Sequence, residues 1–124
     1  MAEAFPANRR QAILTFHFAD RVKAELILAS RLLTTVIQMD GQEREGAGRL
    51  FLDFLKGLEQ EVNLTQIQIN DPDMIRVQTV MKGIIGMADA SMYADIQSHL
   101  TWMISTMTTY AQRSMEYLVK EQLL

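Results

Sequence analysis

The spacing of apolar residues constrains the fold of this chain more than any other feature of its sequence. Apolar side chains recur every three or four residues in four segments, which is the period of one face of an α-helix. The first segment, from about Ala7 to Met39, carries this face at Leu14, Phe18, Val22, Leu26, Ala29, Leu33 and Val36. The sequence therefore predicts a long amphipathic helix in this region.

The second segment repeats the pattern, but both of its ends are ambiguous. Its apolar face contains Leu50 or Phe51, followed by Phe54, Leu58 and Val62. The run from Gln42 to Gly48 fits either the start of this helix or the loop before it. The helix ends before Asn63 or near Ile69, and we expect the stretch between them to be helical because a lone strand would have no pairing partner.

The third and fourth segments complete an all-α chain. A short helix is predicted from Pro72 to about Ala88, because Asn70 and Asp71 supply cap residues directly before a proline. The fourth segment keeps the helical spacing from Tyr93 to Tyr117. These segments predict one domain over residues 1–124, an antiparallel up-down four-helix bundle with helices one and four long and helix three short.

The composition excludes several classes of protein. The chain has 124 residues, of which 48% are hydrophobic, and it contains no cysteine. The absence of cysteine excludes disulfide scaffolds, Cys-ligated metal sites and thiol nucleophiles. A net charge of -3 is unfavourable for general nucleic-acid binding. We therefore expect the basic residues of the first helix to form a solvated face, at Arg9, Arg10, Arg21 and Lys23.

Location and chemistry are predicted from what the sequence lacks. Residues 1–7 contain Glu3 and no basic start, so we expect no secretory leader, and no apolar run reaches membrane-spanning length. These features predict a cytoplasmic protein that does not bind membranes. The sequence also has no Gly-x-Ser-x-Gly elbow, glycine-rich phosphate loop or His-Glu-x-x-His motif. Carboxylate pairs such as Asp71 and Asp73 lie at helix starts or on charged faces. We therefore predict that the protein is not an enzyme.

Two histidines, His17 and His99, limit the metal chemistry that the chain can support. His99, Met103 and Met107 follow one another at steps of four, so the alternative function is a metal- or haem-binding bundle that uses His17, His99 and methionine side chains. The simpler interpretation is that the methionines fill the core, and we expect no metal and no cofactor. A di-iron site is excluded because neither histidine follows a glutamate by three positions.

The expected helix lengths leave apolar surface uncovered. At a rise of about 1.5 Å per residue, helices one and four would be about 50 Å long and helix three about 25 Å. A short helix cannot cover the whole apolar stripe of a long one, and large exposed apolar patches usually mark association. We therefore expect a homodimer or a complex with a protein partner.

The third and fourth segments carry little charge for a surface hairpin. Between Val77 and Gln112 the charged residues are Lys82, Asp89 and Asp95. Opposite its core face, the third helix presents small residues at helical spacing, Thr79, Gly83, Gly86 and Ala90. Glycine inside a helix costs about 1 kcal/mol relative to alanine, so this strip predicts close approach of another helix. The alternative is that Gly86 only ends the helix and that Gly83 has no packing role.

A second strip lies on the fourth helix. At about 100° per residue, Trp102 projects about 130° from the centre of the core stripe, which predicts that the only tryptophan lies outside the core. A ridge of residue types that dominate interface energies contains Trp102, Thr106, Tyr110, Arg113 and Tyr117. The alternative is a wide core stripe with a partly exposed tryptophan.

Methionine is concentrated in the same hairpin. Core positions contain Met74, Met81, Met103 and Met107, and edge positions contain Met87, Met92 and Met115. Together these features predict a non-catalytic, dimeric adaptor or chaperone-like module that binds a protein partner through the hairpin of helices three and four. In size, helix content and acidity the chain resembles the small export chaperones of bacterial flagellar and type III secretion systems, a resemblance of architecture that no motif carries.

Overall fold

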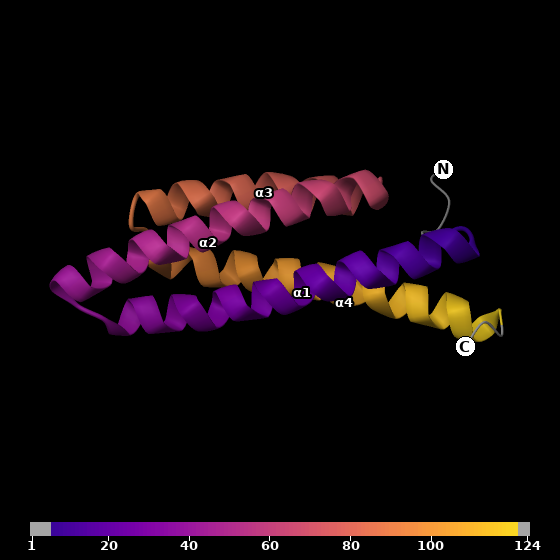
Figure 1. The fold of residues 1–124 in the computed structure, drawn as a ribbon, viewed down its shortest axis with the longest axis horizontal. Coiled ribbons are helices and arrows are strands. Elements are labelled where there is room, and N and C mark those ends of the chain that lie inside the picture. The colour runs from indigo at the N-terminus through magenta and orange to yellow at the C-terminus, as the bar shows by residue number, and fades with distance from the viewer. Residues whose placement is uncertain (1–5, 122–124) are drawn as a thin grey trace.

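The protein is an all-α, up-down four-helix bundle (Figure 1). The computed structural model describes residues 6–121. Its elements in chain order are α1 (Arg9–Gln38), α2 (Gly41–Gln68), α3 (Pro72–Asp89), the 3-10 helix η1 (Tyr93–Asp95) and α4 (Ile96–Lys120). The predicted fold class is confirmed, and α3 is the shortest of the α-helices.

The four helices are packed in a ring in which each contacts its neighbours. α1 and α4 form the most extensive helix pair, and α1 with α2, α2 with α3, and α3 with α4 complete the ring. The start of α1 and the end of α4 lie at one end of the bundle and extend past the turn between α2 and α3 (Figure 1). The α1–α2 side and the α3–α4 side are therefore opposite faces of the molecule.

The helices begin where the sequence supplies capping groups. The Asn8 side chain accepts a hydrogen bond from the Gln11 amide at 2.9 Å, and the Gln11 side chain accepts one from the Ala7 amide at 2.7 Å. This reciprocal cap satisfies amide groups that have no partner within α1. The first turn of α3 follows the same logic, with Asp71 as its N-cap and Pro72 at its first position.

Both ends of α2 are now defined. The helix begins at Gly41, whose φ of +58° lies in the left-handed region that glycine adopts without strain. The run from Gln42 to Gly48 is therefore helical, the first of the two alternatives. At the other end α2 continues to Gln68, so it ends near Ile69 rather than before Asn63.

The Arg44 side chain in the first turns of α2 binds the last turn of α1 and holds the two helix ends together. Its guanidinium donates hydrogen bonds to the Ile37 carbonyl oxygen at 2.7 Å and to the Val36 carbonyl oxygen at 3.4 Å. The last turn of α1 contains no basic residue of its own. Arg44 thus places a positive charge against the negative end of the α1 dipole. It gives the Ile37 carbonyl a donor and adds a second donor to the Val36 carbonyl, which also accepts from the Met39 amide.

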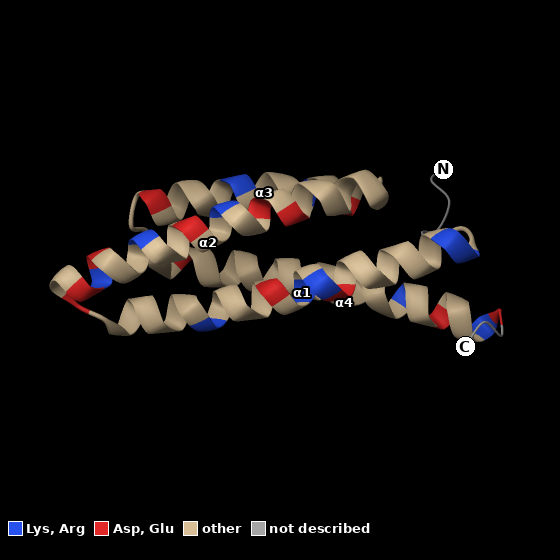
Figure 2. Ribbon diagram, viewed as in Figure 1, with Lys and Arg blue, Asp and Glu red and all other residues tan. Residues whose placement is uncertain are grey.

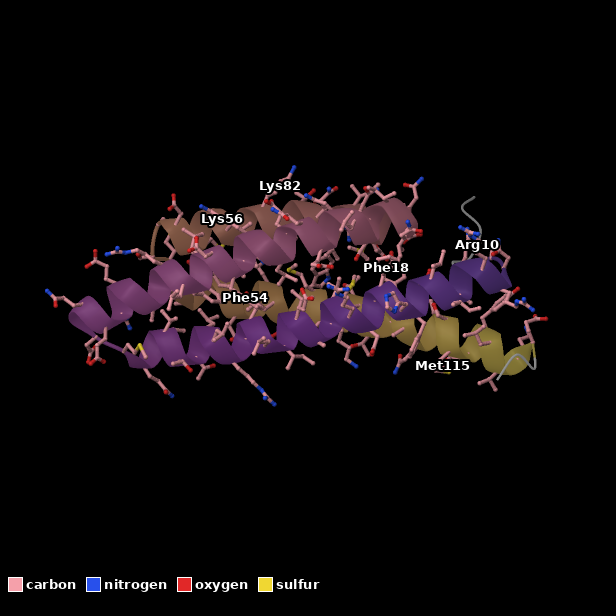
Figure 3. All side chains as sticks on the ribbon, viewed as in Figure 1. Arg10, Phe18, Phe54, Lys56, Lys82 and Met115 are labelled. Atoms are coloured by element: carbon pink, nitrogen blue, oxygen red, sulfur yellow. The ribbon has the colours of Figure 1, made fainter. Side chains whose placement is uncertain are left out.

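The core consists of the apolar stripes that the spacing predicts. The four methionines assigned to core positions are completely buried: Met74, Met81, Met103 and Met107. Between the two candidates at the start of the α2 stripe, Phe51 is buried with 2% exposure, whereas Leu50 is 73% exposed. Phe54 lies between α1 and α2, and Lys56 and Lys82 point away from the bundle (Figure 3).

The helix lengths differ from those expected in one respect. α2 has 28 residues and α4 has 25, so α4 is about 37 Å long rather than about 50 Å. Toward the start of α1 and the end of α4 the small side chains are also buried, including Ala12, Thr15 and Ser114. The core stripes are therefore covered within one chain. The homodimer stays a prediction, and the helix lengths give no support for it.

Tyr110 connects α4 to the turn between α2 and α3. Its side chain has 2% exposure, and its hydroxyl donates a short hydrogen bond to the Asp71 carboxylate. Asp71 also accepts a hydrogen bond from the Asp73 amide at the start of α3. One carboxylate thus caps α3 and anchors α4.

We expect the Tyr110→Phe variant to lose about 1–3 kcal/mol of unfolding free energy, because Asp71 would lose a buried partner. The matched control is Tyr117→Phe, since Tyr117 is half-buried on the same helix without a hydroxyl hydrogen bond among the described residues. Urea unfolding followed by circular dichroism measures both changes. Equal stability of the two variants would contradict the anchoring role.

Candidate interaction surface

Two side-chain hydrogen bonds fix the orientation of α3 and α4. Gln78 donates to the Asn63 side chain of α2 at 2.7 Å, so this flank of α3 faces α2. Gln97 donates to the Ser30 side chain of α1 at 2.9 Å, so this flank of α4 faces α1. The opposite flanks of the two helices must then face each other, because helical positions follow one another at about 100°.

The small-residue strip of α3 and the ridge of α4 both border the side of the bundle on which α3 meets α4. On α3, the flank toward α4 carries the half-buried Val80 and Met87. On α4, the flank toward α3 carries the half-buried Trp102 and Thr106. We call this side of the bundle, with the outer side of each of its two helices, the α3–α4 surface.

The small-residue strip lies on the outer side of α3. All four of its members are exposed, namely Thr79, Gly83, Gly86 and Ala90. A Cβ atom added at Gly83 or Gly86 would meet nothing within 4 Å, so the described part of the chain brings no helix close to them. Gly86 does not end α3, which continues to Asp89. The strip is therefore an open helix surface.

The ridge on α4 is only partly on the outside. Arg113 is exposed, and Trp102, Thr106 and Tyr117 are half-buried. Trp102 packs against the core cluster at the seam with α3, so it is less exposed than its angular position predicts. Tyr110 belongs to the core itself, because its hydroxyl reaches inward to the Asp71 cap.

The outer side of α4 is uncharged over most of its length. Figure 2 shows charged segments in the visible part of α4 only toward its C-terminal end. The exposed positions between Ser98 and Gln112 are occupied by serine, threonine and glutamine. Several threonines of this helix donate their hydroxyl hydrogen to the carbonyl four residues earlier, at 2.8–3.1 Å: Thr101, Thr106, Thr108 and Thr109.

These internal hydrogen bonds lower the cost of covering the surface. A polar group that loses water without gaining a partner is penalised by about 1–3 kcal/mol. On this surface the hydroxyl hydrogens of Thr106 and Thr109 already have partners within α4. The α3–α4 surface is thus less polar than its content of threonine indicates.

The polar end of the α3–α4 surface lies near the start of α3. A cavity of about 90 Å³ is lined there by Asp73, Ser105, Thr106, Thr109, Tyr110 and Arg113. Asp73 and Arg113 bring one negative and one positive side chain to its rim. A partner on this surface would therefore meet an uncharged centre and a charged edge.

The residues of the alternative metal or haem site are not brought together. His17 is exposed on α1 and His99 is half-buried on α4. The bond from Gln97 to Ser30 sets the register of these helices and separates the two histidines by about 16 Å along the bundle axis. Within residues 6–121 no cluster of three or more His, Asp or Glu side chains is placed to hold a metal ion.

A second surface was missed by the sequence prediction. Leu50, which is 73% exposed, lines an apolar cavity of about 240 Å³ between α1 and α2. Leu28, which is 46% exposed, is one helical turn before the lining residue Leu32. The cavity is lined by Leu32, Thr35, Val36, Met39, Ala47, Leu50 and Phe51. We call this cavity, with Leu28 and Leu50, the α1–α2 groove. The signal was the run from Leu50 to Leu55, which holds more apolar residues than one helix face can bury.

None of the described helices combines the length and apolar character needed to cross a membrane. Comparison of the chain with known protein families, with curated proteins and with solved structures gives no match. Proposals about its function therefore depend on the surfaces described above.

Stability at alkaline pH gives a test of the Tyr110 environment. Burial, the hydrogen bond to Asp71 and the negative charges of Asp71 and Asp73 raise the pKa of Tyr110 above its ordinary value of 10.0. The unfolded chain then loses this proton at a lower pH than the folded chain does. The stabilising contribution is complete below about pH 10 and decreases as the pH rises further.

We therefore expect the unfolding free energy of the wild type to fall more steeply above about pH 10 than that of Tyr110→Phe. Urea unfolding at a series of alkaline pH values measures this difference. Parallel curves for the two proteins would contradict the assignment of the raised pKa to Tyr110.

Proposed function

We propose that this protein is a non-catalytic helical interaction module that binds a protein partner through the α3–α4 surface. The observation that carries the proposal is the character of this surface: it is long, uncharged at its centre, and lined by small and hydroxyl-bearing side chains beside a half-buried tryptophan. A surface helix ordinarily carries charged residues on its solvent side. Their scarcity here favours a face that is covered in the functional state.

The shape of the surface favours a helical partner. Gly83 and Gly86 leave open space above the α3 backbone, so a second helix can approach closely there. Trp102 on the neighbouring flank offers a large, partly exposed aromatic anchor of the kind that dominates binding energy at interfaces. Small residues beside an aromatic anchor are suited to receive one apolar helix face.

Methionine at the edges adds adaptability. Met92 is 50% exposed, and Met87 and Met115 are half-buried. Because methionine is unbranched, its side chain can repack against partners of different shape. This property supports the proposed role as an adaptor or chaperone-like module, which we propose to be cytoplasmic and dimeric. No observation favours the metal- or haem-binding alternative, since His17 and His99 lie far apart.

The decisive variant is Gly83→Arg, which places a long cation in the centre of the α3–α4 surface. Gly57→Arg is the matched control, because Gly57 is also an exposed glycine inside a helix with nothing within 4 Å of an added Cβ atom. Both changes should preserve or slightly raise stability, by about 0.5–1 kcal/mol, since arginine is a better helix former than glycine.

We expect Gly83→Arg to reduce partner capture from native lysate by at least about tenfold while Gly57→Arg captures as the wild type does. Trp102→Ala should weaken capture as well. Affinity capture followed by quantitative mass spectrometry measures the effect, with circular dichroism to verify the fold. Capture that is the same for the wild type, Gly83→Arg and Trp102→Ala would refute the proposed surface.

A further inference from the structure

The α1–α2 groove combines a protruding apolar side chain with an apolar hollow. Leu50 is the most exposed of the large hydrophobic residues among those described, and it stands at the edge of the cavity of about 240 Å³. Leu28 and Leu32 extend the apolar surface along α1. A face with both a projection and a hollow can be complementary to itself.

The charges at the groove are divided between its two rims. Arg31 is the only charged residue of α1 between Leu26 and Met39, and it is exposed. Arg21 of α1 pairs with Glu61 of α2, so these two residues mark the flanks that face each other. Arg31 is ten residues from Arg21, and the exposed Asp53 is eight residues from Glu61, so each is turned about 80° around its helix from that flank. Neither takes part in an ion pair within the part of the chain that the structure describes.

Two other cations near the groove, Arg44 and Arg49, already have partners. Arg44 donates to carbonyl oxygens at the end of α1, and Arg49 pairs with Glu45 at 3.1 Å. Lys56 points away from the bundle (Figure 3). Asp40 and Glu43 are exposed as well, but they lie ten or more residues before Asp53, about 15 Å or more along the bundle. Arg31 and Asp53 are therefore one positive and one negative side chain close to Leu50.

Arg31 and Asp53 also lie at nearly the same height along the bundle. The ion pair between Arg21 and Glu61, with a distance of 3.0 Å, sets the register of α1 against α2. Arg31 lies ten residues after Arg21 on α1, and Phe51 lies ten residues before Glu61 on the antiparallel α2. Arg31 and Phe51 are therefore at the same height. Asp53 is two residues from that point, a displacement of about 3 Å.

We propose that a second copy of this chain covers the α1–α2 groove, related to the first by a two-fold axis parallel to the helices. This axis places α1 of one copy over α2 of the other without a change of height. Leu50 of each copy then lies over the cavity of the other, and Arg31 of each copy meets Asp53 of the other at the rim. The contact is isologous, as a closed dimer requires.

The positions of Arg31 and Asp53 favour a second copy of the chain as the occupant and a two-fold axis parallel to the helices. A two-fold axis perpendicular to the helices would set α1 against α1 and bring two Arg31 side chains together, and like charges at an interface are unfavourable. An axis parallel to the helices instead brings Arg31 of each copy to Asp53 of the other, which gives two oppositely charged pairs. A copy of this chain supplies an apolar projection and both charges at matching heights.

This dimer goes beyond the proposed partner site and does not depend on it. The α1–α2 groove and the α3–α4 surface lie on opposite sides of the bundle, so both can be covered at once. The dimer is tested with purified protein alone, whereas the partner site is tested by capture. Failure of one proposal is therefore distinguishable from failure of the other.

The first experiment measures the molecular mass across micromolar concentrations by sedimentation velocity. We expect a dimer for the wild type and at least about a tenfold higher dissociation constant for Leu50→Arg. Ile67→Arg is the matched control, because Ile67 is 68% exposed on the same helix but lies outside the groove. It should dimerise as the wild type does.

The second experiment exchanges the charges. Arg31→Glu and Asp53→Arg should each weaken the dimer, because each places like charges at both rims, and the double variant should restore it. A monomeric wild type, a dimer unaffected by Leu50→Arg, or a double variant as weak as the single ones would each overturn the proposal. Both residues are exposed, and circular dichroism verifies that every variant is folded.

Discussion

The close packing of α1 against α4 is the contact on which the positions of the other helices depend. α1 contributes alanine at several fully buried positions, including Ala19 and Ala29, while α4 contributes larger side chains such as Met103 and Met107. Small residues facing large ones allow two helices to interdigitate at native packing density. α2 and α3 then complete the bundle as the second layer, with α2 seated on α1 and α3 on both α2 and α4.

This arrangement gives the two exposed sides of the bundle different chemistry. The α1–α2 groove is an apolar hollow between rims of opposite charge. The α3–α4 surface is uncharged at its centre, where it carries small residues and threonine hydroxyl groups that are already hydrogen bonded. The first is suited to a partner with the same pattern in reverse, which a copy of the chain supplies. The second is suited to an apolar helix face. A module with both surfaces can associate with itself and still present one binding face per subunit.

The fold was predictable from the sequence because helical periodicity reports burial directly. The choice between Leu50 and Phe51 was not, since neighbouring residues in a helix lie about 100° apart and only the position of α1 decides which is buried. Tyr110 was assigned to the outer ridge because its spacing fits the ridge as well as the core. Its inward orientation depends on Asp71, a partner 39 residues away that no local pattern reveals. The α1–α2 groove likewise requires the register of two helices, which the sequence alone does not define.

The order of the helices along the chain has a consequence for the kinetics of folding. α1 and α2 are joined by two residues and α2 and α3 by three, so these pairs can form from neighbouring segments. The most extensive pair joins the first and last helices, which meet only after a loop of most of the chain has closed. Loop closure lowers the entropy before the contact is gained, and folding slows as the contacts that define the fold become less local. The closure of α1 onto α4 is thus the step expected to limit the folding rate.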